Sequence, residues 1–75
     1  MENKLQNLFS ESLGVPLETV VDDLKYSEIA EWDSVAHMAL IAAIEEAFDI
    51  MIDAEDVIDM SSFAKAKQIV AKYLQ

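Results

Sequence analysis

The sequence predicts an all-α protein, a small four-helix bundle with three longer helices, one short helix and a long loop between helices one and two. Apolar residues recur at three- and four-residue spacing in three segments, and no segment alternates as a strand would. The single glycine and single proline fall together, where the first of these segments ends. The 75 residues predict a single domain, residues 1–75, with a modest core.

The first helix is expected over residues 2–13, where Leu5, Leu8, Phe9 and Leu13 share one face. Gly14 follows at the position that favours a left-handed helix cap, and Pro16 prevents continuation of the helix. Residues 15–32 show no sustained period and predict a long loop with one or two short turns. Six apolar side chains are expected to fix this loop to the core: Val20, Val21, Leu24, Tyr26, Ile29 and Trp32.

The second helix is expected over residues 34–48, and its two faces differ. The face expected to pack on the core comprises His37, Leu40, Ile41, Ala43, Ile44, Ala47 and Phe48. The outer face comprises Val35, Met38, Ala39, Ala42, Glu45 and Glu46, so a small apolar stripe lies beside Ser34. Trp32 could staple the helix start by packing on Ala36 or His37, but simple anchoring of the loop is the preferred interpretation.

The last third of the chain predicts a turn, a short helix and a final helix. Ile50 and Ile52 are expected to point inward, and a short helix over residues 54–59 is expected to use Asp53 as its cap and Asp56 in a capping-box-like arrangement. Ser61 or Ser62 then caps a helix that runs to about Leu74. Its apolar stripe comprises Phe63, Ala66, Ile69, Val70, Tyr73 and Leu74, and three of the lysines lie on the other side.

The charge balance restricts the class of partner. Fifteen acidic residues stand against five lysines and no arginine, for a net charge of −10. Nucleic acids and anionic membranes are disfavoured because both require clustered positive charge. The natural partners are proteins with basic patches. The chain has no cysteine, no signal-peptide pattern and no apolar run of membrane-spanning length, so we expect a cytoplasmic protein.

Two apparent catalytic or metal-binding motifs do not meet the requirements of the chemistry. His37 stands three residues after Ser34, with Asp33 adjacent, but no glycine-rich turn could form an oxyanion hole and an open helix end excludes no water. Segment 49–60 is acidic, but it has Met51, Ala54 and Met60 where a calcium-binding EF-hand loop needs Asp or Asn, Gly and Glu. A hydrolase and a calcium loop are therefore rejected.

Ser34 could instead accept a group in a reaction that another enzyme catalyses. Asp and Ser are common at helix starts as caps, so the Asp33-Ser34 pair alone is a weak signal. An exposed hydroxyl at a helix N-terminus is nevertheless a good place to attach a phosphate-linked group, because the helix dipole and free N–H groups favour an anion there.

The whole chain resembles the acyl carrier protein family. The residues that carry this resemblance are Leu13-Gly14-Val15, Trp32-Asp33-Ser34-Val35, Leu40-Ile41, Ile44-Glu45-Glu46-Ala47-Phe48, Asp49-Ile50-Met51-Ile52 and Ser61-Ser62-Phe63. The resemblance implies a carrier rather than an enzyme. A phosphopantetheinyl transferase would attach 4′-phosphopantetheine from coenzyme A to Ser34, with Mg²⁺ in the transferase and Asp33 as the motif neighbour. The thiol would then carry acyl groups as thioesters between partner enzymes.

The resemblance also implies where partners and cargo are recognised. Partner enzymes would contact Val35, Met38, Ala39, Glu45 and Glu46 on the outer face of the second helix. The candidates to line a cavity for an acyl chain are Leu40, Ile44, Phe48, Ile58 and Ile69. No feature of the sequence requires an oligomer, so a monomer is expected.

Several residues depart from the family pattern. Val35 replaces a usual Leu, Asp49 a frequent Gly and Trp32 a small residue, and the segment from Ala36 to Ala39 lacks the usual acidic residues. These departures suggest a specialised carrier, in a secondary-metabolite, polysaccharide or modified-lipid pathway, rather than the carrier of housekeeping fatty-acid synthesis. The alternatives are an aminoacyl or peptidyl carrier and an unmodified acidic interaction domain.

Overall fold

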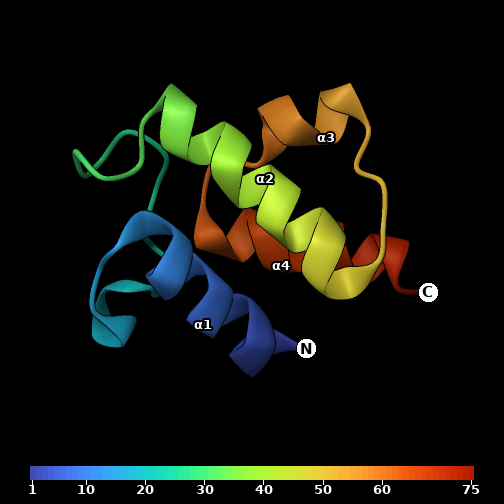
Figure 1. Cartoon of the computed structure of the whole chain (residues 1–75), viewed down its shortest axis with the longest axis horizontal. Coiled ribbons are helices and arrows are strands. Elements are labelled where there is room, and N and C mark those ends of the chain that lie inside the picture. The colour runs from blue at the N-terminus through green and yellow to red at the C-terminus, as the bar shows by residue number, and fades with distance from the viewer.

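The computed structural model describes residues 1–75 and shows four α-helices joined by loops (Figure 1). Its elements are α1 (Glu2–Leu13), the short 3₁₀ turn η1 (Leu17–Thr19), α2 (Ser34–Phe48), α3 (Ala54–Asp59) and α4 (Phe63–Tyr73). The only β-type pairing is an isolated bridge between Lys25 and Ser62. The predicted all-α four-helix bundle with a long first loop is confirmed, and the bounds of α1 and α2 match the prediction. No helix has the length and apolar character needed to cross a membrane.

The ends of the longer helices follow from local chemistry. Gly14 ends α1 in the left-handed conformation, with φ of 70°, and its N–H donates to the Ser10 carbonyl. Asp49 ends α2 in the same conformation, with φ of 55°, although it is not a glycine. Of the two serines considered as the cap of α4, Ser62 is the one used, because its Oγ accepts a hydrogen bond from the N–H of Lys65 at 3.0 Å.

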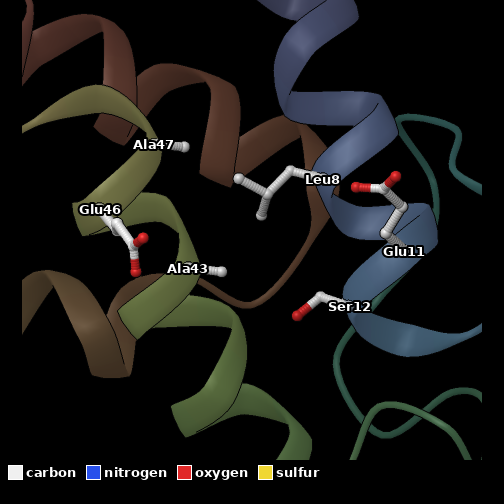
Figure 2. Close-up of a pocket in the computed structure, with 6 residues that line it drawn as sticks. All are labelled: Leu8, Glu11, Ser12, Ala43, Glu46 and Ala47. Carbon is white, nitrogen blue, oxygen red and sulfur yellow. The ribbon is translucent and has the colours of Figure 1, made fainter.

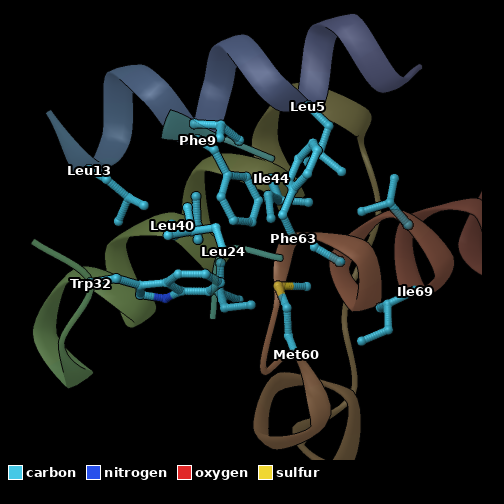
Figure 3. Packing of buried hydrophobic residues seen from close by; sticks show 14 of the residues in the cluster. Leu5, Phe9, Leu13, Leu24, Trp32, Leu40, Ile44, Met60, Phe63 and Ile69 are labelled. Carbon is cyan, nitrogen blue, oxygen red and sulfur yellow. The ribbon is translucent and has the colours of Figure 1, made fainter. Parts of the chain in front are cut away.

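The core lies between α1, α2 and α4 and is joined by residues of the long loop (Figure 3). Phe9 packs edge-to-face on Trp32 and on Phe63, with ring centroids 5.4 Å and 5.0 Å apart. The buried cluster comprises Leu5, Phe9, Leu13, Val15, Val20, Leu24, Trp32, Leu40, Ile41, Ile44, Ile52, Met60, Phe63, Ala66, Ile69 and Val70. Through these two aromatic contacts, Phe9 links the first helix to the loop and to the last helix.

The long loop is fixed at a few points along its length. Val20, Leu24 and Trp32 are buried as predicted, whereas Val21 is half exposed and the prediction for it is wrong. The loop also pairs with the start of α4, because the N–H of Phe63 donates to the Leu24 carbonyl at 2.9 Å. The loop thus brings the residues that precede α2 to a defined position.

The short helix α3 has no buried residue and is held largely by polar contacts. The Tyr73 hydroxyl accepts a hydrogen bond from the N–H of Asp53 at 2.9 Å and donates to the carboxylate of Asp56. Lys72 Nζ lies 2.8 Å from the same carboxylate. The hydrogen bonds from Lys72 and from Tyr73 hold the pKa of Asp56 below its usual value, and the bond with Asp56 raises the pKa of Lys72.

These contacts overturn the capping roles predicted for α3. The side chain of Asp53 makes no cap hydrogen bond, and Asp56 is engaged by α4 rather than by the start of its own helix. Ile58 is 83% exposed, because Val57 takes the inward position and the next residue on a helix points about 100° away. Leu74, expected in the apolar stripe, follows the end of α4 and is partly exposed.

Candidate functional site

Ser34 is the first residue of α2 and is exposed. The capping is done by its neighbour: Asp33 Oδ1 accepts a hydrogen bond from the N–H of Ala36 at 2.8 Å, and the Asp33 carbonyl accepts one from the N–H of His37 at 2.8 Å. The Ser34 hydroxyl is therefore not the side-chain cap of this helix. The motif divides into Asp33, which stabilises the helix start, and Ser34, which is presented to solvent.

The start of α2 also favours an anion. The first N–H groups of a helix have no partner within the helix. Asp33 satisfies those of Ala36 and His37, so the N–H groups of Ser34 and Val35 remain at the end that carries the positive pole of the helix dipole. A phosphate ester on the Ser34 oxygen would lie next to these groups.

A cavity of about 330 Å³ lies directly beside Ser34, between α2 and the α3 region. It is lined by Tyr26, Ser34, His37, Met38, Val57, Ile58, Met60 and Ser61. Ile58, one of the residues proposed to line an acyl cavity, is exposed and forms part of the wall of this cavity beside Ser34. The other residues proposed to line an acyl cavity do not do so: Leu40, Ile44 and Ile69 are buried in the packed core, and Phe48 is half-buried against it.

The inner wall of this cavity is fixed by His37, the only buried polar residue. The indole N–H of Trp32 donates to Nδ1 of His37 at 3.0 Å, and Nε2 of His37 lies 2.8 Å from the carbonyl of Val57. These partners assign the neutral tautomer with the hydrogen on Nε2. The two rings are also stacked, with centroids 6.0 Å apart. His37 therefore joins the loop, α2 and α3, which explains its presence without any catalytic role.

The structure supports both interpretations of Trp32. Its side chain is fully buried and anchors the loop, and it contacts His37 one turn into the helix. Neither the hydrogen bond nor its direction could be read from the sequence. The spacing of five residues between an aromatic residue and a histidine was the only available signal.

The outer face of α2 is largely as predicted. Val35 is 78% and Met38 59% exposed, while Ala39 and Glu46 also face solvent, so an apolar stripe borders Ser34. Glu45 is the exception: it is half-buried, and its carboxylate accepts a hydrogen bond from the N–H of Ile52 at 2.9 Å. The placement of Glu45 on the outer face was therefore wrong, because the turn after α2 folds back over it.

The chain is similar to known proteins in both sequence and fold. A family model described as a phosphopantetheine attachment site matches residues 3–70. An acyl carrier protein of Desulforapulum autotrophicum is 34% identical over 73 residues, which cover 96% of this chain and 95% of that protein. An acyl carrier protein of Cyanidium caldarium is 33% identical over 67 residues, covering 89% and 78%. The solution structure of a holo acyl carrier protein from Geobacter metallireducens matches with a TM-score of 0.85 at 20% identity, covering 97% of this chain and 84% of that one.

Proposed function

The chain belongs to the acyl carrier protein family, whose members share a phosphopantetheine attachment site, and on that premise we propose that Ser34 is the attachment residue. The observation that carries this proposal is that different residues cap α2 and present a free hydroxyl at its start. Asp33 caps the helix, so the adjacent Ser34 hydroxyl is exposed and available. The two remaining N–H groups of the helix start favour the phosphate that attachment would place there.

The attachment reaction would be catalysed by a phosphopantetheinyl transferase. The Ser34 oxygen forms a bond to the phosphorus that carries the pantetheine of coenzyme A, and the pyrophosphate bond of coenzyme A breaks. The nucleoside bisphosphate leaves, and the hydroxyl proton passes to a base of the transferase, where Mg²⁺ stabilises the developing charge. This chain would contribute only the hydroxyl and its orientation, since no residue near Ser34 could activate it.

The cavity beside Ser34 gives the attached arm a surface to rest on. Met38, Val57 and Ile58 are its apolar lining residues, and Tyr26 and Ser61 are lining residues that carry hydroxyl groups. The terminal thiol would hold acyl groups as thioesters and deliver them to partner enzymes in fatty-acid, polyketide or another specialised lipid or secondary-metabolite pathway. The chain would thus act as a carrier and not as a catalyst.

The same surface supports a proposal for how partners recognise the carrier. The apolar stripe of Val35, Met38 and Ala39 borders Ser34, and Glu46 lies further along α2. Acidic residues are absent between Ser34 and Ile44, so the acidic residues nearest to Ser34 along the chain are Glu28, Glu31 and Asp33 in the preceding loop. A partner with an apolar centre and a basic rim would match this arrangement. The lack of acidic residues in the first half of α2 departs from the usual family pattern and favours a specialised pathway. We place that pathway in the cytoplasm, where coenzyme A and the transferase would be available.

The experiment is an intact mass measurement of the purified protein before and after incubation with coenzyme A, Mg²⁺ and a broad-specificity phosphopantetheinyl transferase. We expect a single gain equal to one phosphopantetheine, which is lost in Ser34→Ala. Ser61→Ala is the matched control, because Ser61 is an exposed serine that lines the same cavity.

Two results would refute the assignment. A gain of the same mass in Ser34→Ala would place the attachment on another residue. The absence of any gain in the folded wild-type protein, with this transferase and with that of the source organism, would favour an unmodified acidic interaction domain.

A further inference from the structure

A second cavity, of about 380 Å³, lies between α1 and α2 (Figure 2). We call it the α1–α2 groove, and it is lined by Leu8, Glu11, Ser12, Ala43, Glu46 and Ala47. Figure 2 shows Leu8 of α1 pointing toward the two alanines of α2, with the carboxylates of Glu11 and Glu46 at opposite edges. The groove exists because the α2 residues that face Leu8, Ala43 and Ala47, have small side chains one helical turn apart.

The groove lies on a different side of α2 from Ser34. Ala43 follows Ser34 by nine residues. At about 100° and 1.5 Å per residue, this places it roughly half a turn around the helix and about 14 Å along it. A molecule bound in the groove would therefore leave Ser34 and its cavity open.

The charges around the groove are of one sign. Glu11 and Glu46 are both exposed at its edges. None of the five lysines pairs with Glu11 or Glu46. Lys65 pairs with Asp59, Lys67 with Glu2 and Asp22, and Lys72 with Asp56, while Lys25 binds the Asp23 carbonyl and Lys4 binds the Ala47 carbonyl at one end of the groove. The two glutamates are thus free to attract positive charge from another molecule.

The chain itself shows which chemistry suits the space between these helices. Lys4 lies one turn before Leu8 on α1, and its Nζ crosses to α2, where it lies 2.8 Å from the Ala47 carbonyl and 4.9 Å from the centroid of the Phe48 ring. An aliphatic stem with a cationic head therefore already bridges α1 and α2 at one end of the groove. The open part of the groove offers the same combination of apolar floor and acidic edges.

We propose that the α1–α2 groove is a docking surface for a basic amphipathic segment of a partner protein. A lysine or arginine of that segment would lay its stem over Leu8, Ala43 and Ala47 and place its charge between Glu11 and Glu46. A second copy of this chain is a poor occupant, because each copy carries a net charge of −10. Glu46 is the one residue that the groove shares with the partner surface proposed above. If Ser34 is the attachment site, such a partner could hold the carrier while Val35, Met38 and Ala39 remain open to the enzymes that act at Ser34.

The experiment is an NMR titration of the ¹⁵N-labelled full chain, not carrying phosphopantetheine, with a short acetylated peptide that bears leucine and arginine at helical spacing. We expect amide shifts concentrated at residues that line the α1–α2 groove. Ala43→Phe, which fills the groove, should lower the affinity for the peptide by about tenfold or more. The matched control is Ala42→Phe, which changes an exposed alanine of the same helix and should bind as the wild type does.

A charge test keeps the proposal falsifiable if Ala43→Phe does not fold. The pair Glu11→Gln with Glu46→Gln should weaken binding by about tenfold, whereas Glu28→Gln with Glu31→Gln, which has the same net charge, should change it by less than about twofold. Equal effects of the two pairs, or shifts centred on Val35 and Met38, would overturn the proposal. Saturating peptide should leave the rate of Ser34 loading within about twofold. A failure to load Ser34 at all would refute the proposed function and leave the docking result intact.

Discussion

Replacing His37 by leucine should destabilise the fold by about 2–4 kcal/mol, because it removes two hydrogen bonds and leaves their partners in place. The Trp32 indole N–H is fully buried and has no access to water, so its lost partner should cost the larger share, about 1–3 kcal/mol. The Val57 carbonyl is only partly buried and can bind water, so it should add less. Urea unfolding at neutral pH measures the sum, and thermal unfolding should show a midpoint lowered by roughly 10–25 °C.

A double-mutant cycle separates the hydrogen bond from the loss of packing. Trp32→Phe keeps an aromatic ring but removes the N–H donor, so His37→Leu should cost at least about 1 kcal/mol less in that background than in the wild type. The reasoning would be refuted if His37→Leu stayed within about 0.5 kcal/mol of the wild type, or if the two substitutions were additive.

Three further predictions concern two helix ends and the polar contacts of Asp56 with α4. Asp49→Gly should raise the free energy of unfolding, measured in urea, by about 0.5–1 kcal/mol. Asp49 has a left-handed φ of 55° and places a carboxylate at the negative end of α2, and glycine removes both penalties. Unchanged stability would contradict this account. In the same assay, Asp33→Ala should lower the free energy of unfolding by about 1 kcal/mol and Ser34→Ala by less than about 0.5 kcal/mol, because the aspartate caps the helix. The reverse order would show that the serine is the cap. The pKa of Asp56 is lowered by Lys72 and Tyr73, so its contribution to stability is present above about pH 4 and is lost as the pH falls through its lowered pKa. The urea midpoint of Asp56→Asn should therefore lie below that of the wild type at pH 6, and the gap should narrow as the pH falls below about 4. A gap that did not narrow over this range would exclude this origin.

The sequence predicted α1 and α2 well because both helices carry strong local signals. Gly14 and Pro16 mark the end of α1, and the apolar period fixes the buried face of α2, including His37. The position of Asp33 and Ser34 at a helix start was predicted for the same reason, since the apolar period determines where α2 begins. Which of the two residues caps the helix was decided only by the hydrogen bond to Ala36.

Contacts between segments distant in sequence could not be predicted. Asp56 has the spacing of a capping residue, but a lysine and a tyrosine on α4, 16 and 17 residues later, offer it charge-assisted partners. Glu45 was placed on the outer face from its position in the helix, but the chain reverses after Asp49 and brings the N–H of Ile52 onto it. In both cases the helix was predicted correctly, but the hydrogen-bond partner of the carboxylate is set by tertiary contacts.

Because α3 contains no buried residue, we expect it to be the least stable helix of the molecule. A segment that contributes little buried apolar area opens at a lower free energy than the core against which it rests. Exchange of the α3 amides with deuterium should consequently be faster than exchange in the middle of α1, α2 and α4. Because Val57 and Ile58 form one wall of the cavity beside Ser34, we expect the volume of that cavity to change with local opening of α3 while the core stays folded.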